Sequence, residues 1–540
     1  MGGGQGSGVP RVTARRPWVI HPYLVGVFPI LSLYAKNVYE TRPGDLVWPL
    51  ALAVATALGL WAVARGVLRD GARAGLVASL ALVLFYTVSQ ATASVNRALE
   101  ECSRYWVERP FDVWPPLVVG AELAVFAVLV YLAAARLRNP SALTNYLNVF
   151  AAVLVALPSV SAVRLWARAP ARPVLRAPAL AVAPGAGRAP DIYYIVLDGF
   201  ARGDVLKELF GYDLEPFLRR LERRGFFVAR RSTANYCQTP LSLASSLNAT
   251  YLDGLVNPDS QDTGALGALI GEGAVIRALR SHGYKFVTYA TGFDQTDHPT
   301  ADVYRSPRGY VSGFHRLLLT GTPLWRLLPN PVDGDGYTMA RNRTLFLLDT
   351  LPEVARDPSP TFTFAHVVAP HPPFVFGEDG EDVSPHGVAY YLTDGNLFYD
   401  HYGARVSYNE AYRGEAAYLV RRVEQVVERL LADSPEPPVI ILQSDHGSGS
   451  RLDVTSMENS DLHERMGILN AYHLPGPARA GLYDTITPVN SFRVVFNACL
   501  GARLPLLPDR SYFSTWGEPF RFVDVTDRVS ARPEGMTGPR

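Results

Sequence analysis

Apolar residues dominate the first third of the chain, where they form long uninterrupted runs rather than alternating patterns. Each run has roughly the twenty residues that a helix needs to cross the hydrocarbon layer of a bilayer. The runs lie at about 18–36, 47–68, 74–93, 114–135 and 146–167. Five such runs separated by short polar loops are unusual for the core of a soluble protein. Residues 1–167 are therefore predicted to form a transmembrane domain of five helices.

Basic residues collect in alternate loops of this region. The amino-terminal arm carries Arg11, Arg15 and Arg16, and the second and fourth loops carry Arg65, Arg69, Arg73, Arg136 and Arg138. Because basic loops tend to stay in the cytoplasm, the amino terminus is predicted to be cytoplasmic, and five crossings place everything after residue 168 outside. Arginines between 164 and 188 favour the opposite side, but long domains are translocated largely regardless of flanking charge.

The pattern changes after an Ala- and Pro-rich stretch at 168–190, which is expected to be an extended linker. Short apolar runs typical of buried strands follow at 191–197, 284–290, 361–367 and 438–443, and amphipathic helical patterns lie between them at 212–225, 264–282 and 405–432. Short apolar strands alternating with helices predict a mostly parallel sheet between helices. Residues 191–540 are therefore predicted to form an α/β catalytic domain with its chemistry at the carboxyl ends of strands.

Composition narrows the function classes only slightly. The net charge of +1 at pH 7 gives no indication of a nucleic-acid partner. The three cysteines, Cys102, Cys237 and Cys499, are too few and too scattered for a disulfide framework or a thiolate zinc site.

Four polar clusters lie near predicted strand ends or helix starts. Their members are Asp198, Thr239, His366, His371, Asp445 and His446. Oxygen and imidazole donors in this mixture suit Zn²⁺ or Mn²⁺ better than a thiolate site would. Each member taken alone is also typical of a helix cap or a turn. It is the order and spacing of all of them that indicate a metal-dependent active site.

In this order the motifs resemble the alkaline phosphatase superfamily, specifically its sulfatase-like branch that includes lipoteichoic acid synthases and lipid phosphoethanolamine transferases. The resemblance covers roughly residues 190–475 and extends to the five preceding helices. It implies an alkaline-phosphatase-like fold in which Asp198, Asp445 and His446 bind a divalent metal ion, Mn²⁺ or Zn²⁺. It also implies that Thr239 is the metal-bound nucleophile. Ser242 follows three residues later, as in the Thr-x-x-Ser spacing of the transferases.

The same resemblance implies that His366 and His371 line the substrate pocket or hold a second metal. A further histidine usually follows the Asp-His-Gly motif of the transferases at a shorter distance than His463 does here, so His463 or Arg465 is expected to face the anionic group of the substrate. Cys237 lies three residues before Pro240, and no arginine follows at the required place. The formylglycine chemistry of arylsulfatases is therefore not expected.

The leading hypothesis is a multi-pass enzyme of the cytoplasmic (inner) membrane, with its catalytic domain on the outer side. It would transfer or cleave a phosphoryl-linked group, with a membrane lipid or an envelope glycan as substrate. A membrane-tethered phosphodiesterase or sulfuric ester hydrolase acting on soluble esters is the alternative enzyme, and a non-catalytic membrane scaffold is the alternative class. Five helices favour a lipid substrate, because a simple tether needs only one.

Overall fold

The computed structural model divides the chain into two compact units. It describes residues 18–530 apart from 39–40, 42, 104–114, 169–179, 181–189, 308–312, 324–335, 386–387, 389, 404–405 and 476–480. The helical unit comprises Met1–Ala171 and Val311–Asp333, and the sheet unit comprises Arg172–Tyr310 and Gly334–Arg540. The expected linker at 168–190 lies almost entirely outside the described residues, as do Arg11, Arg15 and Arg16.

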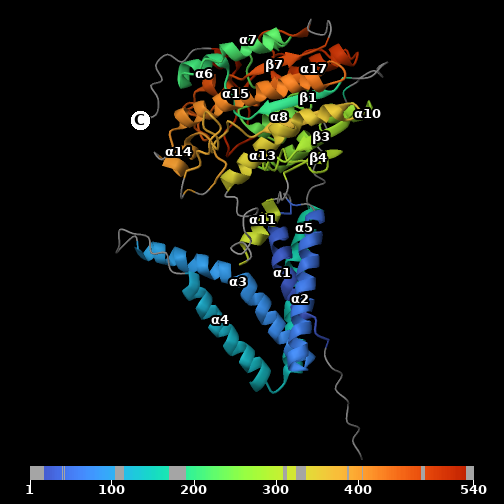
Figure 1. The fold of residues 1–540 in the computed structure, drawn as a ribbon, viewed down its shortest axis with the longest axis vertical. Helices are drawn as coiled ribbons and strands as arrows, with labels where there is room; N and C mark the ends of the chain where they lie inside the picture. Colours follow the sequence, from blue (N-terminus) through green and yellow to red (C-terminus); the bar gives the residue numbers. More distant parts are fainter. Residues whose placement is uncertain are drawn as a thin grey trace, which may run out of the picture. The chain divides into compact units, whose positions relative to one another are not determined.

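All five apolar segments of the amino-terminal region form helices (Figure 1). They are α1 (His21–Lys36), α2 (Val47–Leu68), α3 (Gly71–Ser103), α4 (Pro115–Tyr131) and α5 (Pro140–Arg168), with the short turns η1 (Pro43–Leu46) and η2 (Leu132–Arg136) between them. Within the described residues, two stretches are long and apolar enough to cross a membrane, Pro43–Leu68 and Pro140–Leu165. The five crossings are not confirmed, because α1 has only 16 residues, α4 only 17, and α3 ends in polar residues.

One helix from the second half of the sequence belongs to the helical unit. This helix, α11 (Gly313–Thr320), lies within the range 191–540 that the sequence pattern assigns to the catalytic domain. Phe314 of α11 is buried together with Ile30 of α1 and Ala53 of α2. The His315 Nε2 atom lies 2.9 Å from the backbone oxygen of Asp45, to which its N–H donates. The apolar face of α11 and one hydrogen bond thus hold this helix against α1, η1 and α2.

The sheet unit is built on a seven-stranded sheet that confirms the predicted mostly parallel arrangement. Its strands, in spatial order, are β2 (Phe227–Val228), β7 (Asn470–His473), β6 (Val439–Gln443), β1 (Ile192–Leu197), β5 (Thr361–Val367), β3 (Lys285–Tyr289) and β4 (Val303–Arg305). Strands β6, β1, β5, β3 and β4 are parallel, and β7 is antiparallel to both β6 and β2. The four apolar runs of the sequence correspond to β1, β3, β5 and β6.

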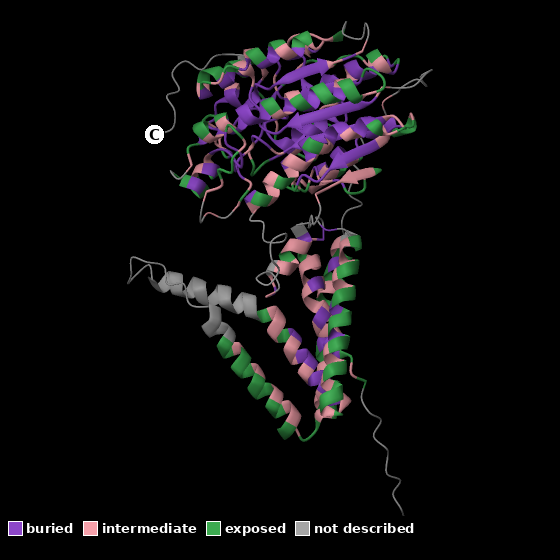
Figure 2. Cartoon of the chain, in the orientation of Figure 1, coloured by how far each residue is buried: buried purple, intermediate pink, exposed green. Residues whose placement is uncertain are grey.

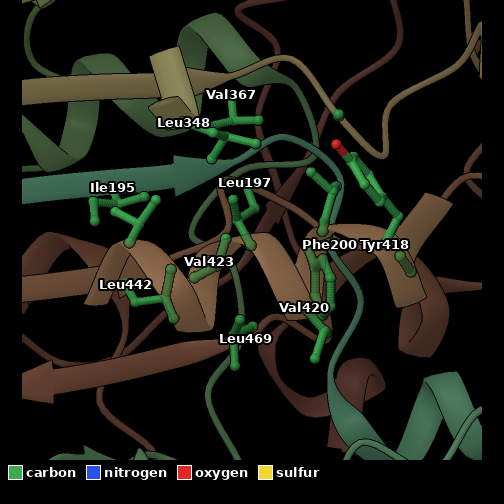
Figure 3. Close-up of a cluster of buried hydrophobic side chains, with 14 of the residues drawn as sticks. Ile195, Leu197, Phe200, Leu348, Val367, Tyr418, Val420, Val423, Leu442 and Leu469 are labelled. Atoms are coloured by element: carbon green, nitrogen blue, oxygen red, sulfur yellow. The ribbon is translucent and has the colours of Figure 1, made fainter. Parts of the chain in front are cut away.

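Helices cover both faces of this sheet, which is almost entirely buried (Figure 2). The alternation of side chains along β1 shows why. Tyr193, Ile195 and Leu197 point into one core cluster, and Ile192, Tyr194 and Val196 point into the other. Part of the first cluster is drawn in Figure 3, including Ile195 and Leu197 of β1 and Val420 and Val423 of α15 (Tyr408–Asp433). A strand apolar on both faces requires a cover on each side.

The helices of the sheet unit divide between the two clusters. The first cluster is completed by α6 (Gly203–Phe210), α7 (Glu215–Arg223), α13 (Gly336–Thr350), η3 (Leu351–Arg356), α14 (Asn396–Tyr402) and α15 (Tyr408–Asp433), and the second by α8 (Thr239–Ser246), α9 (Gly264–Gly271), α10 (Ala274–Ser281) and α17 (Pro488–Cys499). The remaining elements are α16 (Leu462–Met466), α18 (Thr526–Ser530) and the hairpin of β8 (Tyr512–Phe513) and β9 (Val523–Asp524).

Candidate active site

The topology of the sheet brings three distant segments to one edge. Strand β1 lies between β5 and β6, and Val196 pairs with His366 on one side and Gln443 on the other. Because the three strands are parallel, Asp198, His366 and the Asp445-His446 pair all lie at their carboxyl ends. The chain turns sharply after Asp198 at Gly199, which has a φ of +70°, and the Gly199 N–H donates to the Asp445 Oδ1 atom at 3.0 Å.

Five buried side chains form a compact donor cluster at this edge: Asp198, Thr239, His366, Asp445 and His446. The His446 Nε2 atom lies 3.0 Å from Thr239 Oγ1, 3.3 Å from Asp445 Oδ2 and 3.6 Å from Asp198 Oδ1. The His366 Nε2 atom lies 3.2 Å from Asp198 Oδ2. Carboxylate, hydroxyl and imidazole atoms therefore converge on one small volume.

Hydrogen bonds outside the cluster aim both imidazoles inward. The Nδ1–H of His446 donates to the Gly447 backbone oxygen at 2.9 Å. The His366 Nδ1 atom lies 2.9 Å from Thr296 Oγ1, whose hydroxyl donates to the Phe293 backbone oxygen at 3.2 Å and so leaves its oxygen to accept from the His366 Nδ1–H. Each Nε2 atom therefore presents a lone pair to the carboxylates, as histidines that bind metals do. The Asp198 Oδ1, His366 Nε2 and Asp445 Oδ2 atoms are buried without a hydrogen-bond partner.

This donor set fits a divalent cation. Lone pairs that face one another across about 3 Å repel unless a proton or a cation lies between them, and buried polar atoms are rarely left unpaired. One atom each from Asp198, His366 and Asp445 lies within 4.8 Å of the others. Nitrogen and oxygen donors without thiolates match Zn²⁺ or Mn²⁺.

Burial dominates the electrostatics of the cluster. It raises the pKa of Asp198 well above its usual value, and the neighbouring Asp445 carboxylate raises this pKa further. Burial also lowers the pKa of His366 to about 4. It lowers the pKa of His446 as well, where the charge of Arg465 acts in the same direction. Buried imidazoles that stay neutral are in the form that coordinates a metal ion.

Thr239 enters the cluster from the amino end of α8. It is the first residue of that helix, Pro240 follows it, and no side chain caps the helix end. The N–H groups of the first turn and the positive end of the helix dipole therefore face the same region as the hydroxyl. Ser242 lies one turn further on, and its hydroxyl donates to the backbone oxygen of Asp445 at 2.7 Å. Ser242 thus ties α8 to the loop that carries Asp445 and His446.

Arg465 supplies a fixed positive charge beside the cluster. Its side chain is 1% exposed, its Nη2 atom lies 3.2 Å from His446 Nε2, and its Nε–H donates to the Cys237 backbone oxygen at 2.9 Å. The Nη1 atom forms an ion pair with Asp394 Oδ2 at 2.6 Å. The Nη1 group also donates to the Gly447 backbone oxygen at 3.3 Å, so one N–H of Nη2 is left beside the cluster, and the fixed positive charge suits an anion there.

Asp394 is the partner that sets this geometry, and the sequence pattern did not indicate it. It lies in the segment between β5 and α14, where Asp-Gly is typical of an ordinary turn. Its Oδ1 atom accepts hydrogen bonds from the Tyr408 hydroxyl at 3.0 Å and the Gly395 N–H at 2.9 Å. Burial acts to raise the pKa of Asp394, but the charges of Arg465, His371 and His446 and the hydrogen bond from the Gly395 N–H together hold that pKa below its usual value.

Asp394→Asn is expected to weaken the binding of phosphate esters while leaving the fold intact. Asparagine keeps the size and the contact with Tyr408 but removes the charge that orients Arg465. Losing one partner of a buried ion pair costs roughly 2 kcal/mol or more. We expect the inhibition constant of inorganic phosphate and the KM to rise at least about tenfold. Glu464→Gln is the control, because this buried carboxylate binds Ser448 and Ser450 instead. An unchanged phosphate affinity in Asp394→Asn would remove Asp394 from this role.

The structure separates the remaining predicted residues. His371 lies at the border of the cluster, with its Nε2 atom 4.0 Å from Asp394 Oδ2 and its ring centre 6.2 Å from that of His446. His463 has other contacts. Its Nε2 atom lies 3.5 Å from Asp204 Oδ2, and its Nδ1–H donates to the Val529 backbone oxygen at 3.4 Å. Of the pair expected to face an anion, Arg465 therefore adjoins the cluster and His463 does not contact it.

Residues from the last part of the chain pack against the segment that precedes Thr239. The Gln238 Nε2 atom donates to the backbone oxygen of Ser514 at 3.1 Å, and the Cys237 thiol contacts the same residue. Trp516 lies 5.9 Å from the guanidinium carbon of Arg465. Cys237 is fully buried, and burial raises the pKa of its thiol. These contacts give Cys237 a packing role.

Comparisons with known proteins give only distant likenesses. No protein-family model and no curated protein matches the sequence. Among solved structures, the zinc complex of the C-terminal periplasmic domain of EcEptC from Escherichia coli shares 13% identity over 65% of this chain and 97% of its own, with a TM-score of 0.41. The soluble domain of lipooligosaccharide phosphoethanolamine transferase A from Neisseria meningitidis shares 12% identity over 61% of this chain and 97% of its own, with a TM-score of 0.36.

BT1596, a 2-O GAG sulfatase, shares 12% identity over 62% of this chain and 74% of its own, with a TM-score of 0.38. These neighbours are thus phosphoethanolamine transferase domains and a sulfatase. The likeness is distant, so the function proposed below rests on the residues of the site.

Proposed function

We propose that the protein is a membrane-bound, metal-dependent transferase that moves a phosphoryl-linked group from a lipid donor by way of a phosphorylated Thr239. The observation that carries this proposal is the position of the Thr239 hydroxyl. It lies 3.0 Å from His446 Nε2, among carboxylate and imidazole atoms that lack partners, at the uncapped amino end of α8. A hydroxyl is a poor nucleophile by itself, and such a setting is one of the few that activate it.

A divalent ion held by Asp198, Thr239, Asp445 and His446, with His366 facing the same volume, would act as a Lewis acid that favours the alkoxide of Thr239 and neutralises phosphoryl oxygens. The residues of the chain do the rest. Arg465 and the N–H groups of the first turn of α8 bind the non-bridging oxygens and orient phosphorus toward Thr239 Oγ1. Burial of the cluster excludes bulk water, which strengthens each of these interactions.

The reaction has two displacement steps. In the first, the Thr239 Oγ1–phosphorus bond forms, the ester bond between phosphorus and the lipid alcohol breaks, and the departing alkoxide takes up the proton that Thr239 lost. In the second, an acceptor hydroxyl attacks phosphorus, its proton passes to Thr239, and free Thr239 is restored. A glycan, a lipid or water can serve as acceptor, and water as acceptor makes the reaction a hydrolysis.

A sulfatase mechanism fits the site less well. Formylglycine forms from a cysteine or serine that must face the metal, and the Cys237 thiol instead contacts Ser514 in the interior. The experiment that tests the proposal is incubation of the full-length protein with labelled phospholipids and with model phosphate and sulfate esters, in the presence of Mn²⁺ or Zn²⁺. Release of lipid alcohol with label retained on protein or acceptor supports the proposal. Turnover of sulfate esters alone would overturn it.

We expect the sheet unit to lie on the outer side of the cytoplasmic membrane, as the arginine distribution of the loops predicts. A cysteine at the exposed position of Asp253 should react in intact cells with a reagent that cannot cross membranes. A cysteine at Arg138, which is exposed in the loop between α4 and α5, should react only after permeabilisation. The reverse labelling pattern, measured against the unsubstituted protein, would show that the orientation is wrong.

A further inference from the structure

The helical unit contains an elongated cavity of about 880 Å³ between α1, α3, α4, η2, α5 and α11. This volume is in the range of ligand-binding sites, about 300–1,000 Å³. Its wall consists mostly of leucine, valine and phenylalanine side chains, among them Phe28, Leu80, Phe150 and Leu318. An apolar cavity of this size suits a hydrocarbon chain and offers few partners to a polar ligand.

The cavity follows α1 along its whole length. It is lined by residues of this helix from His21 to Lys36, fifteen positions apart. At a rise of about 1.5 Å per residue this distance is roughly 22 Å. One leaflet of a bilayer has a hydrocarbon thickness of about 15 Å. The cavity is therefore long enough to take up an entire acyl chain.

The two ends of the cavity differ in charge. Lys36 is exposed at one end and is the only lysine, arginine or acidic residue among the described residues that line the cavity. At the other end His21 and Ser79 are buried, and the His21 Nδ1 and Ser79 Oγ atoms are hydrogen-bonded at 2.7 Å. The His21 ring packs against Gly75, where an added Cβ atom would lie 3.2 Å from its Nε2. A cation at the open end of an apolar cavity complements a lipid whose head group carries a phosphate.

Helix α11 connects this cavity with the catalytic half of the sequence. Leu317, Leu318 and Gly321, from the segment between β4 and α13, complete the wall near Lys36. Phe314 and His315 fix the helix to its neighbours through the contacts described above. A bundle that served only as a tether would not need a wall built from the catalytic half.

We propose that this cavity is an acyl-chain docking site for the lipid donor, which holds one chain inside and the phosphate of the head group next to Lys36 before that phosphate moves to Thr239. The inference rests on the proposed function, because it supplies the donor of that reaction with a second binding site. It makes the chain length of the donor a determinant of KM.

Filling the cavity tests the inference. In the full-length protein with Mn²⁺, Ser32→Phe should raise the KM for a long-chain phospholipid at least about tenfold, since expelling two or more methylene groups has this effect. The rate on a water-soluble ester with the same head group should not change. Ala55→Phe, on the exposed face of α2 outside the cavity, is the matched control and should alter neither rate. Lys36→Met should raise the KM for the long-chain phospholipid about fivefold, which is the loss in affinity expected when one cation near a phosphate is removed.

Unchanged kinetics of Ser32→Phe on the long-chain donor would overturn the acyl-chain site and leave the proposed function standing. If the unsubstituted protein turns over neither substrate, the proposed function fails instead, and lipid content decides the inference. Mass spectrometry should then find phospholipid bound to the purified unsubstituted protein and to Ala55→Phe but not to Ser32→Phe. Equal lipid content in the three proteins would overturn the acyl-chain site.

Discussion

Replacing Thr239 with alanine is expected to lower the turnover of a phosphate ester by several orders of magnitude, because it removes the attacking oxygen itself. Ser242→Ala should cost less than about tenfold, since it removes one hydrogen bond to the Asp445 backbone, worth roughly 1 kcal/mol. Thr239→Ser keeps a hydroxyl at the same place and should retain part of the activity. The comparison of the three variants separates a nucleophile from a residue that only supports the loop.

The covalent intermediate gives this prediction a direct readout. Rapid denaturation during turnover should trap a phosphorylated peptide within residues 232–248, and fragmentation in the mass spectrometer should place the added mass on Thr239. Thr239→Ala should yield no adduct. An adduct on Ser242 or on Cys237, or normal turnover by Thr239→Ala, would refute the mechanism.

Asp445→Ala is expected to lower bound metal and activity together, because it removes a buried ligand from an already compact cluster. The structure extends the same expectation to His366, whose Nε2 atom faces the Asp198 carboxylate at 3.2 Å. His371→Ala should instead lower activity with little change in metal content, since its ring lies at the border of the cluster. Metal content is measured by elemental mass spectrometry on the purified proteins, and activity after treatment with a chelator and readdition of Mn²⁺ or Zn²⁺.

Asp394→Asn is a suitable control for these variants, because it changes a neighbouring buried carboxylate that binds Arg465 and not the donor cluster. It should keep the metal content of the unsubstituted protein. Full metal occupancy in Asp445→Ala would show that the ligand set is wrong. Loss of metal in His371→Ala would show instead that the cluster extends further toward Asp394.

The sheet and the residues at its edge could be predicted because they depend on local patterns. Four apolar runs gave β1, β3, β5 and β6 within one residue at each end, since strands buried on both faces have few polar positions. Parallel strands then bring their carboxyl ends together, so Asp198, His366 and Asp445 could be placed at one edge before their distances were known. The prediction that Thr239 joins this site depended on its position at the start of a helix, directly before Pro240.

The positions of Asp394 and Trp516 could not be predicted in this way. Neither lies at the end of a strand, and each reaches Arg465 only through the tertiary packing of a loop. His463 and Arg465 are two residues apart on the short helix α16, and they contact different neighbours. Their spacing alone does not determine which of the two side chains faces the site. The sequence pattern also could not predict that α11 belongs to the helical unit. An eight-residue amphipathic helix has the same pattern whichever core it packs against.

The path of the chain through α11 has a consequence for release of the enzyme from the cell. Because Val311–Asp333 returns to the helical unit, the chain passes between the two units three times. A single proteolytic cut within 172–190 would therefore not shed the sheet unit, which stays attached through both flanks of α11. A soluble fragment beginning after such a cut would carry the apolar face of Phe314 and Leu318 without its cover and would be prone to aggregate. Shedding requires further cuts on both sides of α11, so this topology favours retention of the sheet unit on the helical unit.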